Sequence, residues 1–122
     1  MIRNILRYLL SGFMLFAGAN HFMDPGFYLP LIPPYLPFPD LINVVSGALE
    51  ILFGGMLLFP KLRPWGAYGI VGLLVLFIPS HVHFIAIDAC VPDGLCTPIW
   101  VAWARLVVVH PLLLWWAWAM RK

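Results

Sequence analysis

Long apolar runs alternate with short polar or proline-rich connections along the chain. The runs extend over residues 4–22, 41–59, 65–87 and 98–120. Each is close to the ~20 residues that an α-helix needs to cross the ~30 Å hydrocarbon core of a bilayer. We therefore expect an all-α integral membrane protein, a bundle of four transmembrane helices forming a single domain over residues 1–122.

Charged side chains sort by sign among the connections. Basic residues lie at the two ends and between the second and third runs, whereas acidic residues lie in the first and third connections. The basic set is Arg3, Arg7, Lys61, Arg63, Arg121 and Lys122, and the acidic set is Asp24, Asp40, Asp88 and Asp93. Because cytoplasmic loops of membrane proteins carry an excess of Lys and Arg, both termini are predicted on the cytoplasmic side of a bacterial inner membrane.

Composition agrees with this interpretation. The chain is 63% hydrophobic and 10% charged, which is more apolar surface than a soluble domain of this size can bury. The lipid bilayer is the expected partner. No run of Lys or Arg suggests nucleic acid, and there is no room for a separate soluble catalytic domain. No G-x-x-x-G face is present, so the sequence leaves a homo-oligomer open.

The first apolar run has a second interpretation. Arg3 and Arg7, the apolar stretch 8–16 and the small residues 17–19 also have the layout of a secretory signal peptide. We expect this segment to be retained as a helix.

Residues 24–40 contain six prolines interleaved with aliphatic and aromatic side chains, Tyr28 among them. So many prolines disfavour a regular helix and predict extended backbone, which cannot face lipid in the hydrocarbon core. We expect this Pro- and aromatic-rich extracytoplasmic segment to lie at the outer interface. It could be a plain interfacial anchor or a lid over the mouth of the bundle.

Apart from Arg7, near the start of the first run, only Glu50 and Arg105 are charged residues inside long apolar runs. From the helical rise, Glu50 lies roughly 15 Å and Arg105 about 10 Å below the outer ends of their helices. A lone charge at such depth costs on the order of 3 kcal/mol. We therefore predict a Glu50–Arg105 pair that faces the bundle interior, either as a structural clamp, as part of a substrate site, or as both.

Helical spacing supports this inward face. Asn43, Gly47, Glu50 and Gly54 are three or four residues apart and share one stripe of a helix. On the first helix, a second stripe is formed by Ser11, Gly18 and His21. The predicted polar pocket is lined by His21, Tyr28, Asn43, Glu50, His81, His83 and Arg105.

Metal binding is not the preferred interpretation of these histidines. His81 and His83 are two residues apart, about 200° around a helix, so they cannot easily bind one ion. A site of His21, His81 and Glu50 is geometrically conceivable, but we expect hydrogen-bonded histidines and no metal. His110 is assigned no role.

The two cysteines, Cys90 and Cys96, flank the turn sequence Pro92-Asp93-Gly94 in a connection predicted to be extracytoplasmic, where disulfides persist. A structural disulfide is the preferred interpretation, and a redox-active dithiol is the alternative. The six-residue separation is not a C-x-x-C motif.

Several motifs resemble the DoxX family of small four-helix bacterial membrane proteins, over nearly the whole chain. They are Gly18-Ala-Asn-His-Phe22, Ser46-Gly47-Ala-Leu-Glu50, Gly54-Gly55, Phe77-Ile-Pro79-Ser-His81-Val-His83 and Trp103-Ala-Arg105. Many relatives carry asparagine where this chain has His81. The resemblance implies a link to membrane redox systems, including a thiosulfate:quinone oxidoreductase subunit, or to assembly of other membrane proteins.

Three functions follow as hypotheses. The leading one is a subunit of a membrane redox system that binds a small molecule or quinone and contacts other redox subunits; no catalytic residue is identified. The others are an assembly factor without chemistry of its own and a transporter for a small solute.

Overall fold

The computed structural model describes all of residues 1–122 and is entirely helical apart from its connections. Its elements, in chain order, are α1 (Ile2–Met23), α2 (Pro25–Tyr28), the 3₁₀ turn η1 (Leu29–Leu31), α3 (Pro39–Met56), α4 (Arg63–Leu76), α5 (Ile78–Ala86), α6 (Ile99–Ala104), the π-helical turn η2 (Arg105–Val109) and α7 (His110–Ala119). The expectation of an all-α protein is correct.

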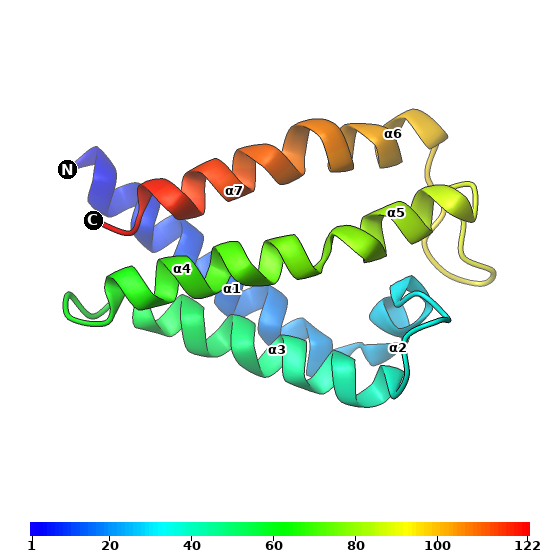
Figure 1. Ribbon diagram of the computed structural model, residues 1–122, viewed down its shortest axis with the longest axis horizontal. Helices are drawn as coiled ribbons and strands as arrows, with labels where there is room; N and C mark the ends of the chain where they lie inside the picture. Colours follow the sequence, from blue (N-terminus) through cyan, green and yellow to red (C-terminus); the bar gives the residue numbers. More distant parts are fainter.

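The long elements lie side by side, with α1 packed on α3, α3 on α4 and α4 on α7 (Figure 1). Both chain termini lie at one end, which we call the terminal end; there, an Arg7 Nη2 donates to the Lys122 carbonyl at 3.0 Å. At the opposite end lie α2, η1 and the connection between α5 and α6, and we call this the cap end (Figure 1).

The prediction of a four-transmembrane-helix bundle is wrong. Only two helical segments, Arg63–Ala86 and Ile99–Ala119, are long and apolar enough to cross a membrane. The predicted crossings at 4–22 and 41–59 correspond to α1 and α3, where polar residues such as Arg7, Asn20 and His21, or Asp40, Asn43 and Glu50, dilute the apolar character. Two segments of this kind are by themselves weak evidence for a membrane protein.

The Pro-rich segment also differs from its prediction, because its first half is helical rather than extended. Pro25 opens α2 and Pro30 lies in the first two residues of η1. The N–H groups in the first turn of a helix have no intrahelical hydrogen-bond partner, so proline, which lacks an N–H, is tolerated there. Ser80 Oγ donates to the Leu31 carbonyl at 2.8 Å and ties this segment to α5.

Two prolines interrupt the apolar segments without ending them. Near Pro79, a kink lies at the boundary between α4 and α5, at Phe77. Near Pro111, the π-helical turn η2 precedes α7. His110 Nε2 contacts the Leu74 carbonyl at 2.6 Å and joins α7 to the end of α4 beside the kink.

The apolar core lies toward the terminal end. It is formed by Leu10, Met14, Leu57, Ala67, Ile70, Leu73, Leu74, Ala117 and Met120. Glycines allow α1 and α3 to approach closely next to it: a Cβ on Gly18 would lie 2.7 Å from the Gly47 carbonyl oxygen. A smaller apolar cluster around Phe84 lies at the cap end, where a disulfide joins Cys90 to Cys96.

Candidate functional site

A cavity of about 190 Å³ opens at the cap end between the Pro-rich segment and the long helices. It gathers residues that are far apart in the chain, from α1, α2, α3, α5 and η2. Six of the seven residues predicted for a polar pocket line it: His21, Tyr28, Asn43, Glu50, His81 and Arg105. His83, the seventh, does not line it.

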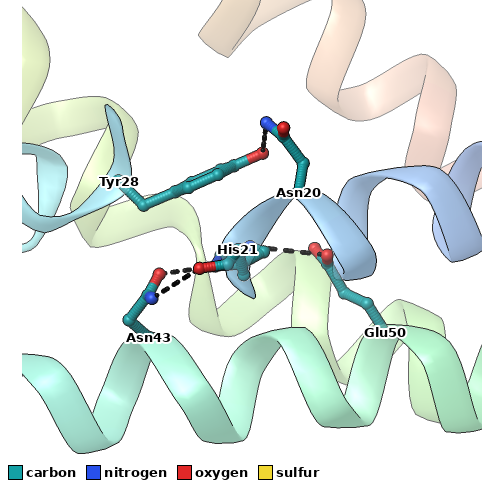
Figure 2. A network of polar contacts seen from close by, with 5 residues as sticks. All are labelled: Asn20, His21, Tyr28, Asn43 and Glu50. Atoms are coloured by element: carbon teal, nitrogen blue, oxygen red, sulfur yellow. Dashed lines mark hydrogen bonds and ion pairs between the residues drawn. The ribbon is translucent and has the colours of Figure 1, made fainter. Parts of the chain in front are cut away.

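Asn43 fixes the orientation of His21 through two contacts (Figure 2). Its Nδ2 donates to the His21 carbonyl at 2.9 Å, which directs its Oδ1 to His21 Nδ1 at 2.7 Å. Because an amide oxygen only accepts hydrogen bonds, the Nδ1 of His21 must carry the proton. The other ring nitrogen, Nε2, faces Glu50.

The contact between His21 and Glu50 therefore needs a second proton. His21 Nε2 lies 3.4 Å from Glu50 Oε2 (Figure 2). With Nδ1 protonated, a neutral imidazole would present a lone pair to the carboxylate, so either Nε2 or the carboxyl group carries a proton. The arrangement forms a site where a proton can be held at the cavity wall.

Glu50 is buried but incompletely paired. Its side chain is 7% exposed, and the 3.4 Å approach of His21 is a charge contact without hydrogen-bond geometry. Oε2 consequently has no hydrogen-bond donor. A buried carboxylate oxygen without a donor is costly, and such groups in native structures call for an explanation. A ligand in the cavity would supply the donor.

The pKa of His21 reflects this environment. Burial of the imidazole acts to lower the pKa, but the close contact with the Glu50 carboxylate, the hydrogen bond with Asn43 and the charge of Glu50 act in the opposite direction. The net result is a pKa raised above the ordinary 6.5. The pairing thus outweighs desolvation, and the protonated ring is the favoured partner of the carboxylate.

Tyr28 covers this network from the α2 side. Its ring stacks on the His21 imidazole with 3.8 Å between centroids and 16° between planes. Asn20 Nδ2 donates to the Tyr28 hydroxyl at 2.8 Å and fixes the ring in place (Figure 2). The Pro-rich segment therefore contributes an ordered wall of the cavity.

Arg105 lines the cavity from η2. Its guanidinium lies 5.3 Å from the centre of the Phe84 ring, and it has neither an ion-pair nor a hydrogen-bond partner in the structure. The predicted direct Glu50–Arg105 ion pair is therefore not formed, because His21, from the neighbouring α1, takes the position beside the carboxylate. Both charged groups instead border the same cavity.

His81, which lines the cavity, also contacts His110, which does not. The His81 ring meets the His110 ring edge to face at 4.8 Å, and His110 is held by the Leu74 carbonyl. No three His, Cys, Asp or Glu side chains are grouped so that they could hold a metal ion.

Sequence reasoning did not identify Phe77 and Ser80, which line the cavity next to the kink. The signal that could have found them is Pro79, because a break in a helix turns the neighbouring side chains toward a cavity. The disulfide between Cys90 and Cys96 is present, away from the cavity. Its role as a structural staple stays a prediction.

Comparison with known families adds one result. Residues 10–121 match the model of the family described as Domain of unknown function (DUF8561), and the chain belongs to this family. No curated protein and no solved structure shows significant similarity to it.

Proposed function

We propose that this member of the DUF8561 family binds a small ring compound in its cavity, with a 1,4-quinol as the best chemical class, and serves as a binding subunit of a membrane redox system. The observation that carries the proposal is the buried carboxylate of Glu50, a residue that lines the cavity and whose Oε2 lacks a hydrogen-bond donor.

The size of the cavity favours a single ring. A cavity of ~150 Å³ accommodates benzene, whereas sites for drug-sized ligands occupy ~300–1,000 Å³. At about 190 Å³, the present cavity suits one substituted ring and little more. Aromatic and aliphatic side chains from the Pro-rich segment and from Phe77 supply flat apolar walls.

The polarity of the cavity favours a ligand that both donates and accepts. The Glu50 carboxylate can accept a hydrogen bond from a ligand hydroxyl, and the guanidinium of Arg105 can donate to a ligand oxygen. A quinol offers both groups on one ring. The proton held between His21 and Glu50 lies beside the position of the hydroxyl, so this pair is suited to exchange a proton with the ligand.

We also propose that the chain lies in the bacterial inner membrane as a multi-pass protein. Within an 18-residue window of each apolar segment, only 22% and 11% of the residues are buried, so these segments differ from the core helices of a soluble protein. Basic residues Lys61, Arg63, Arg121 and Lys122 flank them at the terminal end, which favours cytoplasmic termini and an extracytoplasmic cap end. The resemblance to DoxX proteins favours the redox setting.

The test measures binding of the quinol of 2,3-dimethoxy-5-methyl-1,4-benzoquinone to the purified protein under anaerobic conditions. We expect Glu50→Gln to weaken binding at least about tenfold, because a hydrogen bond to a charged group contributes ~1.5–3 kcal/mol. Arg105→Gln should also weaken binding. Asp40→Asn, which removes an exposed carboxylate of the same helix outside the cavity, is the matched control and should leave affinity unchanged.

Absence of binding to the wild-type protein would contradict the proposal. Equal affinities of the wild-type, Glu50→Gln and Arg105→Gln proteins would also contradict it, because the ring would then bind somewhere else.

A further inference from the structure

A second hollow adjoins the cavity. It is a groove of about 310 Å³ between α3 and α4. Four side chains, Ile42, Ser46, Leu76 and Phe77, border both the groove and the cavity. The two hollows therefore meet along a shared wall.

The groove and the cavity differ in chemistry. Seven of the eight residues that line the groove are hydrophobic, and the exception, Ser46, is one of the shared residues. Beyond this junction the groove is lined by Leu41, Val45, Leu49 and Leu73 only. Every charged or histidine side chain of the combined site lies on the cavity side.

We infer that the ligand is an amphiphile, with its ring in the cavity and a hydrocarbon chain along the groove between α3 and α4. The adjacency of the two hollows, which share four lining residues, and the confinement of charged and histidine side chains to one of them support this assignment. The inference rests on the proposed function and extends it from a ring to a ring with an apolar tail.

A hydrocarbon chain on the ligand would occupy the groove, which the ring alone leaves empty. The cavity has room for one ring, so a longer substituent must leave it, and the adjacent groove, which shares four lining residues with the cavity, offers it an apolar surface. Leu41 and Val45 are 60% and 44% exposed, so the groove is open on its α3 side and can accept a flexible chain there.

The experiment compares two probes, the quinol used above and the same ring carrying a decyl chain. Each buried CH₂ is worth about a fourfold gain in affinity, so we expect the decyl compound to bind the wild-type protein at least about tenfold more tightly. Val45→Phe narrows the groove and should remove most of this gain while leaving the affinity for the plain ring unchanged.

Val44→Phe is the matched control. Val44 is the adjacent residue of α3, is 47% exposed and lines neither hollow, so this variant should retain the gain. Leu41→Phe provides a second narrowing variant should Val45→Phe fail to fold. Both probes are measured in the same lipid nanodiscs, so partition of the decyl chain into lipid affects all variants equally.

The outcomes separate the two proposals. If both probes bind with equal affinity, the tail assignment is overturned and the cavity proposal is retained. If the decyl compound still binds more tightly than the plain ring by the same factor in Val45→Phe and Leu41→Phe, the decyl chain lies outside the groove, for example in lipid. The tail assignment is then also overturned. If neither probe binds the wild-type protein, both proposals fail.

Discussion

The terminal end and the cap end are built from the same long helices but in contrasting ways. At the terminal end, Leu57, Ala67, Ile70 and Ala117 are all 0% exposed and pack into one apolar core. At the cap end, polar side chains line a cavity, and Glu50 Oε2 has no hydrogen-bond donor. The terminal end is dominated by apolar packing, although the buried Arg7 Nε there also lacks a partner, whereas the cap end is dominated by a cavity with polar and charged walls.

The contrast indicates where stability and where binding reside. Close packing of apolar side chains stabilises a fold, whereas an unsatisfied buried carboxylate lowers its stability until a ligand binds. A substitution at the terminal end should therefore affect unfolding more than binding. A substitution at the cap end should have the opposite effect.

The largest effect is expected for Ile70→Ala in α4. Removing buried methyl and methylene groups from a core that cannot fully collapse typically costs about 2–5 kcal/mol. Val75→Ala, at a residue of the same helix that is 50% exposed, should stay within ~0.5 kcal/mol of the wild type. Denaturant unfolding of both variants measures the difference, and equal stabilities would show that the terminal end is not the stabilising core.

An intermediate effect is expected for Gly47→Ala, which affects both ends. A Cβ at this position would lie 2.7 Å from His21 Cβ and 2.9 Å from the Gly18 carbonyl oxygen, so α1 must move away from α3. Overpacking of this kind costs ~1–3 kcal/mol. The shift also moves His21 relative to Glu50 and should weaken quinol binding.

Gly72→Ala is the matched control for this substitution, because a Cβ there meets no atom within 4 Å. Alanine favours a helix over glycine by ~1 kcal/mol, so this variant should be as stable as the wild type or more stable. Thermal unfolding and quinol affinity are measured for both variants. A Gly47→Ala protein with wild-type values for both would contradict the close approach of α1 and α3.

The smallest effect is a pH dependence that arises from His21. Because its pKa is raised in the folded protein, the folded state holds the proton more tightly than the unfolded state, and the resulting stabilisation is complete below about pH 6.5. The stabilisation is lost as the pH rises through the folded-state pKa. Glu50→Gln removes the carboxylate that raises this pKa, so its stability should decline less than that of the wild type as the pH rises above about 6.5.

The difference in unfolding free energy between the two proteins isolates this contribution, because His81, His83 and His110 are present in both. Parallel pH profiles of the wild-type protein and Glu50→Gln would show that His21 and Glu50 are not coupled.

Much of the cap end was predictable because it depends on local spacing. The stripe of Asn43, Gly47, Glu50 and Gly54 was predicted to face inward, and all four residues are buried in α3. The positions of Ser11, Gly18 and His21 were predicted in the same way, and they too are buried. Three- and four-residue spacing suffices for such predictions, since it depends only on the geometry of one helix.

Partners across helices were not predictable in the same way. Glu50 was expected to face Arg105 because the two residues lie at similar depths in their helices. Depth does not specify rotation about the helix axis, however. The closely packed glycines of α1 and α3 place His21, rather than Arg105, beside Glu50. The number of membrane-crossing segments was overestimated for a related reason. The length of an apolar run does not take into account the polar residues that α1 and α3 contribute to the site.

The most direct test of the cavity as a quinol site is an experimental density map of the protein prepared with the plain-ring quinol. The account predicts ring-shaped density in the cavity, with one oxygen at hydrogen-bonding distance from the Glu50 carboxylate and another at that distance from the Arg105 guanidinium. An empty cavity with Glu50 and Arg105 paired directly to each other would contradict it.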